Sequence, residues 1–216
     1  MEYVNYIKDP EAIEKKSFEI IRSRIDARRF SDGELAVVQR VIHATADFDY
    51  EEILEFSPDA VEKGLAALKA GCGIVTDTRM AQAGINRRAL EALGCRILCY
   101  VDDPEAVAIA RERGITRSMA AMELASKDPK NLIFAIGNAP TALFKLAELI
   151  QEGKVRPSLV VGVPVGFVGA AESKETLFRL RVPSIITRGR KGGTTVAVSI
   201  VNALLYALVK EGPCGG

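Results

Sequence analysis

The chain is poor in the residues on which many catalytic sites depend. It has one histidine, four cysteines and no tryptophan among its 216 residues. No two cysteines form a Cys-x-x-Cys pair, and their spacing matches no zinc framework. The four are Cys72, Cys95, Cys99 and Cys214. Cysteines of this kind are typical of free, buried thiols in a reducing cytosol.

An excess of charge and a long apolar run are also missing. The sequence has 29 Lys and Arg residues against 28 Asp and Glu, a formal net charge of +1. This balance argues against a protein that coats nucleic acid, although it leaves room for a local basic site that binds a small polyanion. Residues 1–5 show no secretory signal, and no run reaches the ~18 apolar residues of a membrane span. We therefore expect a cytoplasmic protein without a nucleic-acid or membrane partner.

Common motifs for metal, covalent and nucleotide chemistry are equally scarce. No cluster of His, Cys, Asp and Glu predicts a bound metal, and no Ser or Cys lies in a nucleophile elbow. Gly162, Gly166 and Gly169 have the wrong spacing for a dinucleotide fingerprint. Residues 188–194 lack the Gly-Lys-Ser/Thr order of a Walker A loop. The sequence therefore gives little support to a nucleotide site.

What is present is the composition of an ordinary globular protein, with 48% hydrophobic and 26% charged residues. A chain of this length can bury a sizeable core. We expect one domain over 1–216, made of a helical extension (1–70), an α/β core (71–211) and a flexible tail (212–216). Capping signals at Asp9-Pro10, Ser31 or Asp32, and Ser57-Pro58 predict helices over 10–29, 31–46 and 57–70.

Beyond residue 70, short apolar runs alternate with helical patterns. The runs that predict strands are 73–76, 96–101, 132–136, 158–163 and 182–187. Helices are expected near 79–93, 104–126, 139–152, 170–180 and 194–210. This alternation is typical of βαβ units, in which helices cover both faces of a parallel sheet. The sequence thus predicts a three-layer α/β/α fold with a five-stranded, mainly parallel, flavodoxin-like sheet and an N-terminal helical extension.

Polar and glycine-rich segments follow the predicted strands, where open parallel sheets bind their ligands. Each glycine-rich turn by itself also suits a tight strand-to-helix connection. Several such turns on one edge favour a binding site, because glycine lets the backbone approach a ligand and helix N-termini attract anions. The cations that these segments place on the same edge are Arg79, Lys174, Arg188, Arg190 and Lys191.

The single histidine, His43, lies near the end of a predicted amphipathic helix. The apolar residues of this helix recur at helical spacing: Leu35, Val38, Ile42 and Ala46. Arg40 and Asp47 share the polar face with His43. Histidine is the only side-chain type that ordinarily titrates near neutral pH, so a proton shuttle of that kind would be His43. A surface residue, or a half-buried one with satisfied hydrogen bonds, is the alternative interpretation.

Seven segments together resemble the precorrin-8X methylmutases of corrin (vitamin B12) biosynthesis. They are residues 17–18, 40–44, 77–80, 116–118, 135–143, 162–174 and 188–193. The resemblance covers nearly the whole chain. Its most specific part is the run Gly-Val-Pro-Val-Gly-Phe-Val-Gly-Ala-Ala-Glu-Ser-Lys at 162–174.

The resemblance implies a cytoplasmic, homodimeric isomerase that moves a methyl group from C11 to C12 of ring C by a suprafacial 1,5-shift. The product is hydrogenobyrinate from precorrin-8X or cobyrinate from cobalt-precorrin-8. The run His-Ala-Thr-Ala-Asp at 43–47 is more similar to the cobalt-dependent branch. A methyl shift within one molecule needs no cofactor, and none is expected.

The family's active-site histidine corresponds to His43, and its substrate-contacting serine and arginine correspond to Ser17 and Arg40. The carboxylate arms of a corrinoid also call for cationic and polar partners. The further substrate-binding residues that we expect are Thr45, Arg79, Arg117, Asn138, Thr141, Lys174, Arg188 and Arg190.

Our hypothesis is that protonated His43 donates a proton or a strong hydrogen bond near the nitrogen of ring C. The helix C-terminus and Asp47 would favour the imidazolium, whereas Arg40 would oppose it. Two alternatives stay open. The same site would suit a non-catalytic corrinoid carrier. A flavodoxin-like signalling domain is less well supported, because Thr78 and Arg79 follow Asp77 where acidic residues would be expected.

Overall fold

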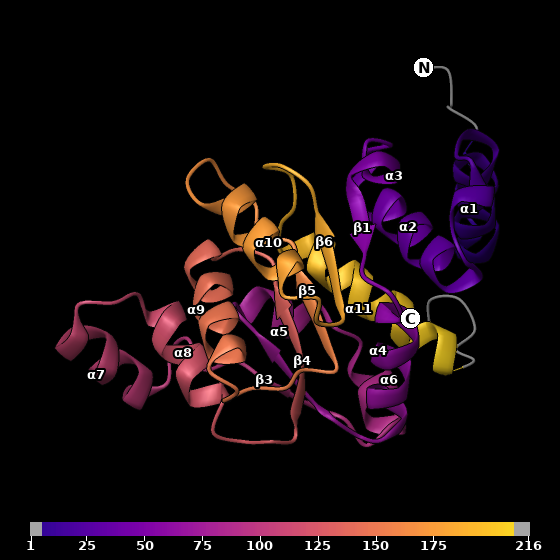
Figure 1. Ribbon diagram of the computed structural model, residues 1–216. Helices are drawn as coiled ribbons and strands as arrows, with labels where there is room; N and C mark the ends of the chain where they lie inside the picture. The colour runs from indigo at the N-terminus through magenta and orange to yellow at the C-terminus, as the bar shows by residue number, and fades with distance from the viewer. Residues whose placement is uncertain (1–5, 210–216) are drawn as a thin grey trace, which may run out of the picture.

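The computed structural model describes residues 6–209, and its N-terminal part is helical (Figure 1). It contains α1 (Pro10–Arg24), a 3₁₀ turn (Ala27–Arg29), α2 (Asp32–Thr45) and α3 (Tyr50–Ile53). Two predicted helix starts are confirmed, because the Asp9 carboxylate caps α1 and Ser31 forms a capping box with Glu34 at the start of α2. The first helix is shorter than the predicted 10–29. It ends at Arg24, since Ile25 takes an extended backbone and is buried.

Within residues 6–209 the sheet has six strands, so the prediction of five is wrong by one edge strand. The additional strand, β1 (Leu54–Phe56), runs antiparallel to β6 (Ser184–Thr187). Ser57 continues this pairing, because its N–H donates to the carbonyl of Ser184 and its Oγ accepts from the N–H of Ser184. With three residues and a glutamate at its centre, β1 is too short to give a strand pattern in the sequence.

The five predicted strands all exist and are parallel. They are β2 (Gly73–Thr76), β3 (Arg96–Leu98), β4 (Asn131–Ile136), β5 (Leu159–Gly162) and β6. The order across the sheet is β1-β6-β5-β4-β2-β3. The carboxyl ends of the parallel strands therefore lie along one side, which we call the carboxyl edge.

Helices follow most strands, as expected, but two predicted helices are divided. The remaining helices are α4 (Ala60–Lys69), α5 (Arg79–Gly84), α6 (Arg87–Ala92), α7 (Pro104–Arg113), α8 (Arg117–Ala125), α9 (Pro140–Gln151), α10 (Ala170–Arg179) and α11 (Thr194–Leu208). Asn86 caps α6 and so divides the predicted 79–93 helix. Gly114, at φ 62°, ends α7, and Thr116 caps α8. The predicted tail, 212–216, and Cys214 lie outside the described residues.

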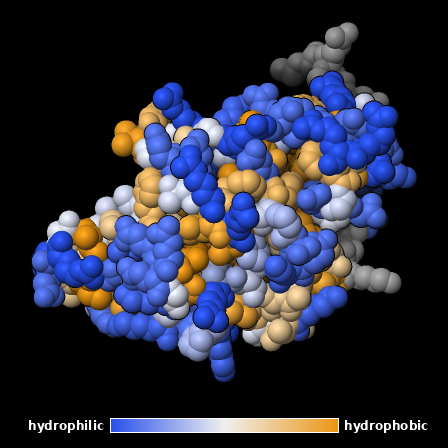
Figure 2. All heavy atoms as spheres, in the orientation of Figure 1, coloured by the Kyte–Doolittle hydropathy of each residue, from blue (hydrophilic) through white to orange (hydrophobic). Residues whose placement is uncertain are grey.

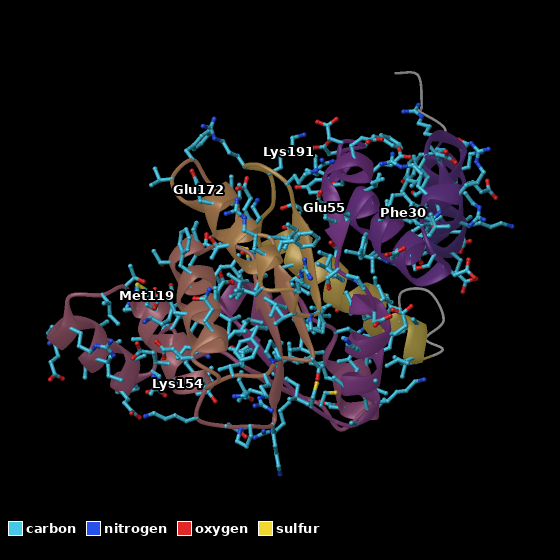
Figure 3. All side chains as sticks on the ribbon, in the orientation of Figure 1. Phe30, Glu55, Met119, Lys154, Glu172 and Lys191 are labelled. Carbon is cyan, nitrogen blue, oxygen red and sulfur yellow. The ribbon has the colours of Figure 1, made fainter. Side chains whose placement is uncertain are left out.

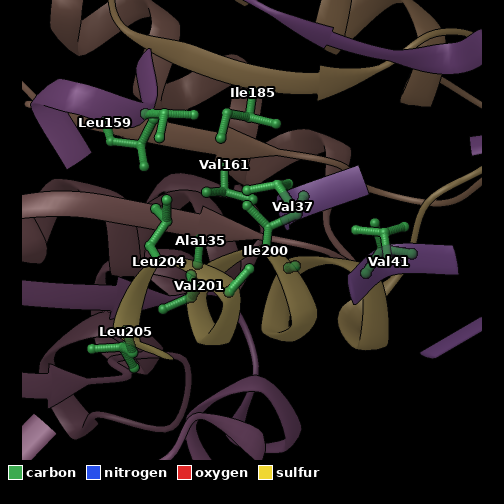
Figure 4. Packing of buried hydrophobic residues seen from close by; sticks show 14 of the residues in the cluster. Val37, Val41, Ala135, Leu159, Val161, Ile185, Ile200, Val201, Leu204 and Leu205 are labelled. Carbon is green, nitrogen blue, oxygen red and sulfur yellow. The ribbon is translucent and has the colours of Figure 1, made fainter. Parts of the chain in front are cut away.

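The extension is docked on the sheet through α11. One face of the sheet packs against α4 and α11, and α2 packs on α11 in turn (Figure 4). Val37, Val38 and Val41 of α2 are fully buried in this cluster. The other face packs against α8, α9 and α10. Between residues 6 and 209, no helix combines the length and apolar character of a membrane span.

Candidate functional site

His43 lies exposed in the last turn of α2, with its ring against Phe18 of α1. The two rings are stacked, with centroids 5.1 Å apart and an interplanar angle of 14°. No hydrogen bond to either ring nitrogen of His43 occurs within the part of the chain that the structure describes. The alternative of a half-buried histidine with satisfied hydrogen bonds is therefore wrong. Phe18 holds one face of the ring, and the nitrogens stay open to a ligand.

Arg40 is fixed by the same aromatic residue. Its guanidinium lies 4.8 Å from the ring centroid of Phe18 and 5.0 Å from that of Tyr206. Arg40 also forms a 3.0 Å ion pair with Glu14 of α1. Cation–π contacts and a partly buried ion pair restrict this side chain strongly. Arg40 and His43 thus present a rigid pair of side chains on one face of α2.

The hydroxyl groups of Ser17 in α1 and Thr45 in α2 form hydrogen bonds to neighbouring residues of the chain. The Ser17 hydroxyl donates to the carbonyl of Ile13 at 2.8 Å. The Thr45 hydroxyl donates to the carbonyl of Val41 at 2.8 Å and accepts from the N–H of Asp47 at 3.3 Å. Each hydroxyl keeps acceptor capacity for a ligand donor.

Asp47 pairs with Lys191 and not with the imidazole. Lys191 Nζ lies 2.6 Å from Asp47 Oδ2 and 2.7 Å from Asp49 Oδ2. The hydrogen bond from Lys191 lowers the pKa of Asp47, and the two carboxylates raise the pKa of Lys191. The Tyr50 hydroxyl adds a 3.5 Å contact to the carbonyl of Gly192, and burial raises its pKa. These contacts bind the loop that follows α2 to the β6–α11 loop (residues 188–193).

Arg188 strengthens the same junction, which Figure 3 shows around the labelled Glu55 and Lys191. Its guanidinium donates to the carbonyl of Glu52 at 2.6 Å and lies 3.1 Å from the carboxylate of Glu55. Arg190, two residues on, instead lies exposed, with its guanidinium 5.8 Å from the ring centroid of Phe167. Arg188 is therefore engaged with the extension, whereas Arg190 lies near an aromatic residue of the β5–α10 connection.

A second group of predicted residues lies at the other end of the carboxyl edge. Arg79 and Arg117 share one carboxylate, that of Asp102, at 3.4 Å and 3.3 Å. Thr141 contacts the hydroxyl of Thr116 at 3.0 Å. Two guanidinium groups on a single half-exposed carboxylate retain capacity for a further anion. The structure shows no direct contact between this group and the His43 group within residues 6–209.

Asn138 is placed by a residue that the sequence analysis did not select, Asp77. The buried Asp77 carboxylate accepts hydrogen bonds from the N–H groups of Gly137, Asn138 and Ala139, at 3.2, 2.8 and 2.8 Å. Burial raises the pKa of Asp77, although the three N–H donors counteract this. The carboxylate fixes the β4–α9 connection and leaves the Asn138 side chain exposed. Asp77 could have been found from the sequence, because it is an aspartate directly after a predicted buried strand.

Lys174 lies elsewhere than expected. Instead of extending from the edge, it is 1% exposed and points into the molecule. Its ammonium donates to Thr187 Oγ1 at 3.2 Å and to the carbonyl of Lys191 at 2.9 Å. Burial lowers its pKa to about 8. The prediction of a cation on the open edge is therefore wrong for this residue, because its amphipathic helix turns it toward the core.

The carboxyl edge also carries exposed apolar side chains, whereas the sequence pointed only to cationic and polar residues there. Met80 is 71% exposed, Phe167 86% and Val168 89%. Figure 2 shows hydrophobic surface over the loop that precedes α10. Phe167 and Val168 are adjacent in this loop, whereas Met80 lies in α5 after β2; large exposed apolar side chains are typical of binding surfaces. Cations together with apolar side chains suit a flat, apolar ligand that carries carboxylates at its rim.

A cavity of about 240 Å³ is separate from this site. Its lining includes Ser126, Asn131 and Arg156, near the amino ends of β4 and β5. None of the predicted site residues lines it. In the stretch 6–209, no group of three or more His, Cys, Asp and Glu residues is placed to hold a metal ion. The chemistry that the exposed site offers is thus that of one imidazole, several guanidinium groups and backbone N–H groups.

Comparison with known proteins identifies the family. Residues 12–207 match the family model described as precorrin-8X methylmutase. A Salmonella typhimurium protein named cobalt-precorrin-8 methylmutase is 51% identical over 211 residues, which cover 95% of this chain and 99% of the relative. A precorrin-8X methylmutase of a Sinorhizobium species is 44% identical, over 93% of this chain and 96% of that protein.

The fold agrees with this match. A crystal structure of a precorrin-8X methylmutase from Thermus thermophilus superposes with a TM-score of 0.83 at 43% identity. The match covers 90% of this chain and 94% of the other. The chain belongs to the precorrin-8X methylmutase family.

Proposed function

We propose that this chain is an isomerase of cobalamin biosynthesis that moves a methyl group from C11 to C12 of ring C. The substrate is cobalt-precorrin-8 and the product cobyrinate; precorrin-8X and hydrogenobyrinate are the metal-free counterparts. Family membership supports the reaction. Relatives named cobalt-precorrin-8 methylmutase at 51% and 46% identity support the cobalt branch, although precorrin-8X methylmutases match at 44% and 42%.

His43 is the catalytic residue of this proposal, and the observation that carries it is the open, stacked imidazole. Migration of a methyl group draws electron density through the macrocycle. A proton or a strong hydrogen bond from His43 near the ring C nitrogen stabilises that redistribution, and the proton returns when the product forms. A positioned general acid contributes about 10²- to 10⁴-fold. The reaction is an isomerisation, so no other reactant is consumed.

The remaining residues bind the macrocycle. Met80, Phe167 and Val168 cover an apolar face, while cationic and polar side chains take the carboxylate arms. The substrate-binding residues of this proposal are Ser17, Arg40, Thr45, Arg79, Arg117, Asn138, Thr141, Arg188 and Arg190. Lys174 is left out of this set because its ammonium is buried.

The test is to compare wild type with His43→Ala in turnover of cobalt-precorrin-8 and in affinity for cobyrinate. We expect kcat to fall at least about 100-fold, while the Kd of cobyrinate changes less than about threefold. Gln39→Ala, one helical turn earlier, is the matched control and keeps the wild-type kcat. Full turnover by His43→Ala would refute the proton-donor role. Binding without turnover in the wild type would instead favour the corrinoid carrier.

We propose four further features that the sequence suggested. The parallel strands follow the order β3-β2-β4-β5-β6, and this order supports a flavodoxin-like class with three layers. The whole chain forms one domain. The exposed Ile13 and Ile20 of α1 support a homodimer, to be checked by light scattering during gel filtration. The free thiols of Cys72, Cys95 and Cys99 support a cytoplasmic location.

A further inference from the structure

Lys174 is a buried ammonium whose partners are all neutral oxygens. It donates to Thr187 Oγ1 and to the carbonyl of Lys191, and Thr187 Oγ1 donates to the same carbonyl at 2.7 Å. No carboxylate pairs with it within residues 6–209. Burying a charge without a counter-ion is costly, and an apolar side chain of similar length would fill the same space without that cost. The position of Lys174 therefore needs an explanation other than stability.

Lys191 connects this buried group to the helix of the active site. Its carbonyl accepts from Lys174, and its ammonium binds Asp47 and Asp49, the residues that follow α2. A continuous set of polar contacts thus runs from Lys174 through Lys191 to Asp47. His43 lies in the last turn of α2, which ends at Thr45, and Asp47 follows directly after the C-cap Ala46.

The β6–α11 loop has little freedom to relax around these contacts. The N–H of Gly193 donates to the carbonyl of Val163 at 2.8 Å, and the N–H of Gly166 donates to that of Arg190 at 3.2 Å. A Cβ on Gly192 would lie 2.1 Å from the carbonyl oxygen of Val163. Lys174 supports this loop from the core side, at the carbonyl of Lys191, so removal of the Lys174 ammonium takes away a contact that places Lys191.

We propose that Lys174 is a positioning residue for the methyl shift, because it fixes the β6–α11 loop from which Lys191 holds the end of α2 and thereby sets the place of His43. The proposal rests on the function assigned to His43 above. It differs from a direct substrate contact, which the 1% exposure of Lys174 excludes in this structure. The alternative is that Lys174 only stabilises the fold.

The single histidine makes the test direct. The untagged protein has one histidine, so its ring gives one set of ¹H–¹³C NMR signals. We expect Lys174→Met to shift these signals and Lys191→Met to shift them in the same direction. Lys145→Met is the matched control. Its side chain is 14% exposed and pairs with Glu123 and Glu148, far along the chain from this loop. It leaves the histidine signals at their wild-type positions.

This readout does not require turnover, so it separates the inference from the proposed function. Unchanged histidine signals in Lys174→Met would overturn the inference even if the wild type is an active methylmutase. Lys191→Met guards against misfolding, because the side chain of Lys191 is 47% exposed and its removal leaves the core intact. The inference would also be overturned if the histidine signals of Lys191→Met matched those of the wild type.

Turnover provides the second measurement. We expect Lys174→Met to lower kcat about tenfold or more, with KM nearly unchanged, because displacement of a catalytic group by a fraction of an ångström slows the chemical step. If Lys174 and Lys191 act through one set of contacts, the double variant loses no more kcat than the more affected single variant. Fully additive losses would contradict a common route.

Discussion

His43, which we propose as the catalytic residue, is held against the ring of an aromatic neighbour, Phe18. The imidazole is exposed, yet stacking on Phe18 at 5.1 Å restricts its rotation. The sequence pointed to His43, because it is the single histidine, but the family resemblance at residues 17–18 was used for Ser17 and not for Phe18. It left open what Asp47 does. In the structure, Asp47 binds Lys191, a residue 144 positions later in the chain. Periodicity within one helix cannot predict such a pairing.

Phe18→Leu tests the stacking at the level of the single residue. Leucine keeps most of the apolar volume but offers no ring face to His43 or Arg40. Loss of a stacked pair costs about 0.5–1.5 kcal/mol, so we expect kcat to fall about threefold to tenfold. Phe30→Leu is the control, because Phe30 makes an edge contact with Phe56 at 6.5 Å and faces none of the site residues named here. Wild-type kcat in Phe18→Leu would show that the ring does not position His43.

At the level of elements, the site depends on how α2, the loop that follows it and the β6–α11 loop are held together. The starts of α1 and α2 were predictable, because Asp9 and Ser31 act through their nearest neighbours in the chain. The strand β1 was not, since Glu55 and its neighbours become a strand only by pairing with β6. The burial of Lys174 was also missed, because its helix faces the core there. Local signals predicted the starts of α1 and α2, but not that of α4, which begins at Ala60 because Ser57 pairs with Ser184 of β6. Tertiary contacts decide the edges of the sheet and the orientation of the helices.

Gly192→Ala tests the support of the β6–α11 loop. Gly192 has φ 155°, and an added Cβ would meet the Val163 carbonyl at 2.1 Å. Gly189, in the same loop, has φ 70° but no atom within 4 Å of an added Cβ. We expect Gly192→Ala to lower the free energy of unfolding by at least about 1 kcal/mol more than Gly189→Ala, because only the former adds a clash to the backbone strain. Equal losses in denaturant titrations would contradict this account of the loop.

At the scale of the whole molecule, the parallel sheet gathers residues from distant segments onto one edge. The five parallel strands and their order along the chain were predictable from alternating apolar and helical patterns. The expected anion-binding edge follows from this topology, since each strand delivers its next segment to the same side. The apolar part of the edge, Met80, Phe167 and Val168, was overlooked because exposure cannot be read from residue type. Cationic and apolar side chains together match an amphipathic macrocycle better than either set alone.

We infer that this chain catalyses a methyl shift and does not merely bind a corrinoid. The most direct test is to incubate a small amount of the purified protein with a large excess of cobalt-precorrin-8 and to follow absorbance and mass. We expect many equivalents of cobyrinate per protein chain, with an unchanged mass and a changed absorbance spectrum. Conversion that stops at one equivalent or less, with the ligand still bound, would contradict it.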